Sequence, residues 1–171
     1  MPISVIVDDH LPLENFSTNL TMYAKVASDG ALWGPVLEKS FAKYLGMYEA
    51  IDAGSAAHGI EAMTGAPYDT IWHWDLSTNT GATLTREMYW EKLLSADRDN
   101  QMITCGTPTG TGSDQDSNEF GLPYNHALSI KRVLTVKDNS GVEHRLVELR
   151  NPWAIERFFG DWSDSSDRWT D

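Results

Sequence analysis

The stretch that decides the fold is NHALSIKRVLTVKDNSGVEHRLVELRNPW, residues 125–153. Two runs rich in β-branched and other apolar residues flank the polar sequence KDNSG, whose composition is typical of a turn. The stretch therefore predicts an antiparallel β-hairpin with a turn of four or five residues.

The same hairpin predicts that two polar side chains meet. If the turn is centred between Asn139 and Ser140, the numbers of paired residues add up to about 279, and His126 lies opposite Trp153 and diagonal to Asn151. Side chains two positions apart share a face of the sheet, so we expect His126 and Asn151 to lie within reach of each other. A bulge or a one-residue slip would spoil this arrangement.

An imidazole oriented by an amide can take a proton from a thiol, which is the chemistry of a Cys-His-Asn site. From the hairpin alone, however, a histidine that bonds to a strand neighbour without any catalytic role is the more common case. The register of the hairpin thus leaves both interpretations of His126 open.

Upstream of the hairpin, the spacing of apolar residues predicts helices. Apolar side chains recur along one helical stripe over 32–45, with Glu38, Lys39 and Lys43 facing away, and Gly46 ends the pattern. Shorter helices are predicted over 55–65 and 85–96, each beginning at a serine or threonine that can cap it.

Short apolar runs predict three further strands, over residues 3–7, 20–26 and 101–105. The glycine-rich polar stretch 106–121 follows the last of them and predicts a mobile loop. Helices thus come first and antiparallel strands afterwards, which is typical of an α+β fold.

Composition limits the partners of the chain. Its 171 residues include 13 basic and 25 acidic side chains, for a formal charge of −12. This field repels phosphate backbones and anionic lipid surfaces, so we expect neither nucleic acid nor membrane as a partner. The single cysteine, Cys105, forms no intrachain disulfide, and the sequence contains no signal peptide or spanning run, so we expect a cytoplasmic (intracellular) protein.

Several segments, taken in order, resemble the calpain family of cysteine proteases. The sequences GLPYNHALSI (121–130) and LVELRNPWAIERFFGDWSDSSDRW (146–169) are similar to the second half of the papain-like catalytic core of that family. Four segments nearer the N-terminus also match its motifs: VIVDDHLP (5–12), LWGPVLEKSFAKYLGMYEAIDAG (32–54), GIEAMTG (59–65) and MITCG (102–106).

This resemblance implies a papain-like half-domain with an antiparallel sheet or partial barrel and about three helices. Residues 1–28 would be a strand segment joining from the first half of the core, and 29–171 the second subdomain. The resemblance also implies roles: His126 as general base, Asn151 as the residue that orients it, and Trp153 as a shield that also wedges between the two halves in calcium-free enzymes. The gating loop would contain Gly106, Gly110 and Gly112.

The nucleophilic cysteine of the family belongs to the first half of the core and has no counterpart here. Cys105 aligns with a structural cysteine on a strand, so we expect a free buried thiol. The resemblance thus implies a part of an endopeptidase that is inactive alone, whose partners are the first half of the core and peptide substrates. A catalytically dead, calpain-like interaction module is the alternative, and a carbohydrate-binding domain built on the tryptophans is a third hypothesis.

Metal binding is expected at most in a longer protein. Family members bind calcium through acidic loops, and Asp164 matches one such acid, but Arg157 stands where the resemblance expects a glutamate. The sequence DQDSNEFG (114–121) departs from a calcium-binding EF-hand at two positions, and WHWD (72–75) is more typical of a packed strand than of a metal or sugar site. His10, His58 and His144 have no convergent partners in the sequence.

Overall fold

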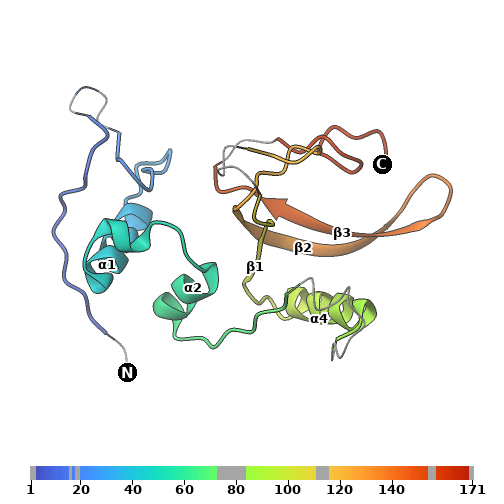
Figure 1. The fold of residues 1–171 in the computed structure, drawn as a ribbon, viewed down its shortest axis with the longest axis horizontal. Coiled ribbons are helices and arrows are strands. Elements are labelled where there is room, and N and C mark those ends of the chain that lie inside the picture. Colours follow the sequence, from blue (N-terminus) through green and yellow to red (C-terminus); the bar gives the residue numbers. More distant parts are fainter. Residues whose placement is uncertain are drawn as a thin grey trace. The chain divides into compact units, whose positions relative to one another are not determined.

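A computed structural model describes residues 3–15, 17, 20–72, 84–110, 116–153 and 157–169. The contacts within the chain divide it into two units, Met1–Tyr68 and Asp69–Asp171 (Figure 1). The resemblance implies a different kind of boundary, between residues 28 and 29, where the first half of the protease core would join the second. That boundary stays a prediction. None of the described helices is long and apolar enough to cross a membrane.

The first unit is helical, as its periodicity predicts. Helix α1 (Trp33–Leu45) ends at Gly46, whose φ of 114° few other residues adopt. The short 3₁₀ helix η1 (Tyr48–Ile51) follows, and α2 (Ala56–Thr64) begins after Ser55 and ends at the left-handed Gly65. The predicted helix boundaries are therefore confirmed to within a residue.

The strands predicted over 3–7 and 20–26 are wrong. The described residues of both segments are irregular, and a single bridge joins Leu13 to Thr21. The reason is that these segments bond to the polar side of α1, where the Lys43 ammonium donates to the Ile6 carbonyl at 2.7 Å and Glu38 accepts from the Ala24 N–H at 3.0 Å. These backbone groups are thus bonded to side chains rather than to a neighbouring strand.

The apolar stripe of α1 is less buried than its pattern predicts. Within the described residues, the buried side chains of this helix are Pro35 and Ala42, while Trp33 is 73% exposed and Tyr44 53% exposed. The polar side of α1 therefore makes the contacts with the N-terminal segment.

The described residues of the second unit form an α-helix and a sheet. Helix α4 (Arg86–Arg98) precedes the strands β1 (Ile103–Gly106), β2 (Ala127–Lys137) and β3 (Glu143–Arg150), which form an antiparallel sheet in the order β1-β2-β3. The Thr85 side chain caps α4 by accepting from the Met88 N–H. In the part of the chain that the structure describes, three α-helices and a three-stranded antiparallel sheet confirm the α+β class.

Helix α4 packs against β2, and one arginine of β3 also binds it. The Arg145 guanidinium binds the Glu87 carboxylate at 2.6 Å and lies over the Trp90 ring at 5.3 Å. Trp90 is the buried residue of the helix. The alkyl and planar parts of Arg145 thus cover an apolar side chain while its charge is paired.

The turn of the hairpin is built on Asp138. Its Oδ1 accepts from the Ser140 N–H at 2.9 Å and from the Val142 N–H at 3.0 Å, and Gly141 adopts a φ of 84°. The turn spans 138–142 and is centred on Ser140, so its predicted length is confirmed and its predicted centre is half a residue too early.

A β-bulge corrects the register before the strands reach their far end. Near the turn, as at Arg132 opposite Glu148, paired numbers add up to 280; beyond Lys131, as at Ser129 opposite Arg150, they add up to 279. Lys131 is the extra residue, and it shares the Glu148 carboxylate with Arg132 at 2.7 and 2.5 Å. The bulge therefore creates at the far end the register that the sequence predicts.

Candidate active site

The far end of the hairpin brings His126 and Asn151 together. Continued from Ser129 opposite Arg150, the register places His126 opposite Trp153 and diagonal to Asn151. The two side chains are joined by a hydrogen bond of 2.9 Å between His126 Nε2 and Asn151 Oδ1. The prediction that this pair meets is confirmed.

The hydrogen bonds around Asn151 settle which ring nitrogen carries the proton. The backbone N–H of Trp153 also donates to Oδ1, at 3.0 Å, so this atom of the amide is an acceptor. His126 Nε2 must then be the donor, and Nδ1 of the neutral ring is left with its lone pair. Among the described residues, no hydrogen bond to Nδ1 is found. This is the tautomer that a general base acting through Nδ1 requires.

Trp153 lies against the imidazole. The two ring centroids are 4.2 Å apart with an interplanar angle of 43°, and His126 is only 9% exposed. The guanidinium carbon of Arg157 lies 5.6 Å from the centroid of the same indole. Trp153 therefore lies against the imidazole that bonds to Asn151, and its roles as a shield of that bond and as a wedge between two halves stay predictions.

Thr107 holds the backbone of His126. Its hydroxyl accepts from the His126 N–H at 2.9 Å, and its own N–H donates to the His126 carbonyl at 2.9 Å. Asn125, just before the histidine, adopts a φ of 50° and donates its N–H to the Pro108 carbonyl at 3.1 Å. The sequence contains no pattern that would have identified Thr107, because its position opposite His126 follows from the pairing of β1 with β2.

The glycine-rich segment departs from the end of β1, beside His126. Gly106 is the last residue of that strand. A Cβ at Gly110 would lie 2.4 Å from Cγ of the Tyr124 side chain, so only glycine fits against that ring. Gly112 lies outside the described residues, and the gating role of 106–121 stays a prediction.

Cys105 is the free thiol that the sequence predicts. It lies on β1 opposite Leu128, and burial raises the pKa of its thiol. A raised pKa disfavours the thiolate, which is the reactive form of cysteine. Cys105 is therefore poorly suited to act as a nucleophile.

The absence of a partner predicted for His144 is wrong. Its Nε2 lies 2.9 Å from Asp138 Oδ2 across the turn, and its ring lies 5.2 Å from the Trp162 indole. The Asp138 carboxylate accepts from the Ser140 hydroxyl and from His144, and both lower the pKa of its carboxyl group. The hairpin pattern could have revealed this pair, because residues 138 and 144 flank the turn.

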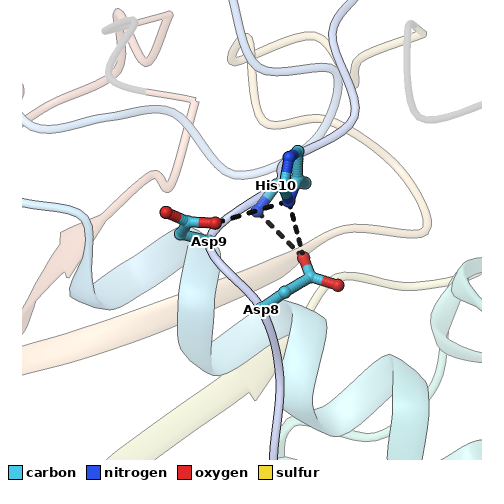
Figure 2. A group of neighbouring side chains, drawn as sticks. All are labelled: Asp8, Asp9 and His10. Carbon is cyan, nitrogen blue, oxygen red and sulfur yellow. Dashed lines mark hydrogen bonds and ion pairs between the residues drawn. The ribbon is translucent and has the colours of Figure 1, made fainter.

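A group of three ligating side chains is formed by Asp8, Asp9 and His10 (Figure 2). His10 Nδ1 lies 3.5 Å from the Asp8 carboxylate and 3.3 Å from that of Asp9, and all three residues are exposed. The Lys39 ammonium binds Asp8 and lowers the pKa of its carboxyl group to about 2. The Lys39 ammonium thus already supplies a positive charge to one of the two carboxylates of this group.

The acid predicted for calcium does not form a comparable group. Asp164 is exposed, and among the described residues it joins no cluster of three ligating His, Cys, Asp or Glu side chains. Arg157 places a positive charge at the position where a glutamate ligand is expected. Within the described residues, Asp164 and Arg157 do not by themselves form a calcium site, and calcium binding by a longer protein stays a prediction. Residues 73–75 and 111–115 lie outside the described part.

An α+β fold whose hairpin joins a histidine to an asparagine is consistent with a half-domain of a papain-like cysteine protease. The family model described as "Calpain family cysteine protease" matches residues 2–171 of this chain, so the chain belongs to the calpain family.

Named relatives agree with this assignment. The chain is 35% identical over 171 residues to the calpain-type cysteine protease DEK1 of Arabidopsis thaliana, which covers 99% of this chain and 7% of that protein. It is 30% identical over 177 residues to Calpain-5 of Mus musculus, a match that covers 98% of this chain and 27% of that protein. It is also 30% identical over 168 residues to Calpain-9 of Homo sapiens, a match that covers 98% of this chain and 22% of that protein. The chain thus spans about a quarter or less of the length of these relatives.

Proposed function

We propose that this chain supplies the general base and its orienting partner to a calpain-type cysteine endopeptidase. His126 Nδ1 takes the proton of a cysteine thiol that lies outside this chain, while Asn151 holds the ring. The thiolate attacks a peptide carbonyl, the imidazolium protonates the leaving amine, and water then hydrolyses the acyl-enzyme. The observation that carries the proposal is the 2.9 Å bond from Nε2 to an amide oxygen, which leaves Nδ1 as the base.

The proposal includes the absence of peptidase activity in the chain alone. The single cysteine of the chain is Cys105, whose thiol pKa is raised by burial. The cysteine would come from the first half of the core in the same polypeptide, which is consistent with the small share of the relatives that this chain covers.

The remaining features follow from the same proposal. The substrates are proteins or peptides, and the loop 106–121 borders the cleft that receives them. The complete protein acts in the cytoplasm, and calcium binding is proposed only for that longer protein, because Asp164 joins no cluster of three ligating side chains among the described residues.

A fluorogenic peptide assay tests the proposal. The purified chain is expected to give no hydrolysis, and the longest polypeptide encoded with this segment is expected to give hydrolysis that His126→Ala abolishes. His144→Ala is the matched control, because it removes the other hydrogen-bonded histidine of the hairpin. Hydrolysis by the chain alone, lost in His126→Ala, would contradict the assignment of the nucleophile.

A catalytically inactive interaction module is the second candidate, because the single cysteine of the chain is not activated. The residues encoded before this segment discriminate between the two. A Gln and a Gly-x-Cys-Trp sequence there would support the protease, whereas serine or glycine at the cysteine position would support the module.

A further inference from the structure

Trp153 takes part in three contacts at the site. Its backbone N–H donates to Asn151 Oδ1, its indole lies 4.2 Å from the His126 ring, and the Arg157 guanidinium lies over the indole at 5.6 Å. The first contact fixes only the main chain of Trp153. The orientation of the indole against the His126 ring must come from contacts of the indole itself.

The main chain of Arg157 is held against the end of the loop 106–121. A Cβ at Gly121, which has a φ of 83°, would lie 1.9 Å from the Arg157 carbonyl oxygen, so only a glycine permits this approach. Two residues further on, the Phe159 N–H donates to the Phe120 carbonyl at 3.2 Å. The backbone from which the guanidinium extends is thus fixed at two points by the loop.

The charge of Arg157 is directed to the indole rather than to an acid. Within the described part of the chain, no carboxylate lies within ion-pair distance of this guanidinium, whereas Arg168 in the same segment binds Asp161 at 2.8 Å. A guanidinium over an indole face is attracted by the negative charge of the ring face, and this attraction persists at an exposed position.

We infer that Arg157 is a positioning residue, whose guanidinium holds the Trp153 indole against the His126 ring and so limits the access of water to its bond with Asn151. Removing the guanidinium frees the indole to move, and water then reaches the Nε2 proton more often. The inference rests on the proposed function only in that it calls His126 a base. Its geometric content is measurable in this chain without any peptidase activity.

Exchange of the His126 Nε2 proton with water, followed by ¹⁵N-edited NMR of histidine-labelled chain, tests the inference. An exposed cation–π contact changes an equilibrium about two- to five-fold, so Arg157→Met is expected to accelerate the exchange by about that factor. Arg157→Lys, which retains a cation, is expected to restore most of the protection. Arg168→Met is the matched control and is expected to leave the exchange unchanged.

A double-mutant cycle separates positioning from a general loss of stability. Trp153→Ala is expected to accelerate the exchange, and Arg157→Met is expected to add nothing in that background. Equal exchange in Arg157→Met and the unmodified chain, or an equal acceleration with and without Trp153, would overturn the inference. Failure of the proposed function would instead appear as a complete polypeptide without peptidase activity whose exchange rates still follow this pattern.

Discussion

The two ends of one hairpin carry two histidines that are alike in geometry and different in partner. At the far end, His126 Nε2 lies 2.9 Å from an amide oxygen and 4.2 Å, ring to ring, from an indole. At the turn end, His144 Nε2 lies 2.9 Å from a carboxylate oxygen and 5.2 Å from another indole. The difference is the charge of the partner.

The charge of the partner determines what each pair is suited to do. Asp138 accepts from the backbone of the turn as well as from His144, and the pKa of its carboxyl group lies below the usual range, so this pair holds the turn. Asn151 orients its histidine without placing a full charge beside the ring. The amide therefore fixes the tautomer and leaves Nδ1 available for proton transfer.

The largest expected effect is a difference in kcat/KM between variants of the two histidines. In the longest polypeptide encoded with this segment, His126→Ala is expected to lower kcat/KM by about 10⁴-fold, because it removes the proposed general base. His144→Ala is expected to leave kcat/KM within about two-fold, because it acts only at the turn. A peptide hydrolysis assay measures kcat/KM of both variants. Similar losses of kcat/KM in the two would contradict a catalytic role that is specific to His126.

Removal of the orienting amide is expected to have the next largest effect. Asn151→Ala in the same polypeptide should lower kcat by about 10²-fold with little change in KM, since the ring loses its fixed tautomer but substrate contacts remain. Asn139→Ala, in the turn, is the matched control and should change neither constant. A rise in KM alone would assign Asn151 to substrate binding instead.

A smaller effect is expected from the residue that holds the backbone of His126. Thr107→Val leaves the His126 N–H without its acceptor and should lower kcat by about tenfold through misplacement of the ring. Thr107→Ser should restore activity, because the hydroxyl returns. Thr104→Val, on β1 opposite Ser129, is the control. Equal kcat values for the Val and Ser variants at 107 would remove Thr107 from the site.

The smallest expected effect is on stability and belongs to the turn. The pKa of the Asp138 carboxyl group is lowered by folding, so its ionised form stabilises the protein above its unfolded pKa of about 4, and this contribution is lost as the pH falls toward the folded pKa. Asp138→Asn is expected to lower Tm by about 2–4 °C at pH 7 and by less at pH 3.

Thermal melts at several pH values check this expectation, with peptidase activity of the complete polypeptide as the second readout. A Tm difference that is the same at pH 7 and pH 3 would contradict the role of the carboxylate. A loss of activity comparable with that of Asn151→Ala would contradict the separation of the two ends.

Sequence reasoning reached the site because the site depends on the periodicity of one hairpin. His126 and Asn151 meet as predicted, yet the predicted centre of the turn was wrong and the bulge at Lys131 compensates for it. At this bulge Lys131 and Arg132 share the Glu148 carboxylate, a contact that side-chain alternation does not encode.

The parts that the sequence did not predict depend on contacts between elements. Thr107 bonds to His126 because the pairing of β1 with β2 places the two residues opposite each other. Arg157 lies over Trp153, and its main chain passes so close to residue 121 that only a glycine fits there. The strands expected over 3–7 and 20–26 failed for the same reason, because side chains of α1 bind their backbone. Local secondary-structure propensity does not predict such partners.

The most direct test of Asn151 as the residue that orients a histidine base is to find which ring nitrogen of His126 carries the proton. Long-range ¹H–¹⁵N NMR of histidine-labelled chain, at a pH where the ring is neutral, distinguishes the two nitrogens. A proton on Nε2 and a bare Nδ1, with the preference lost in Asn151→Ala, is the result that a base oriented by Asn151 requires. A proton on Nδ1, or a spectrum that Asn151→Ala leaves unchanged, would contradict the account.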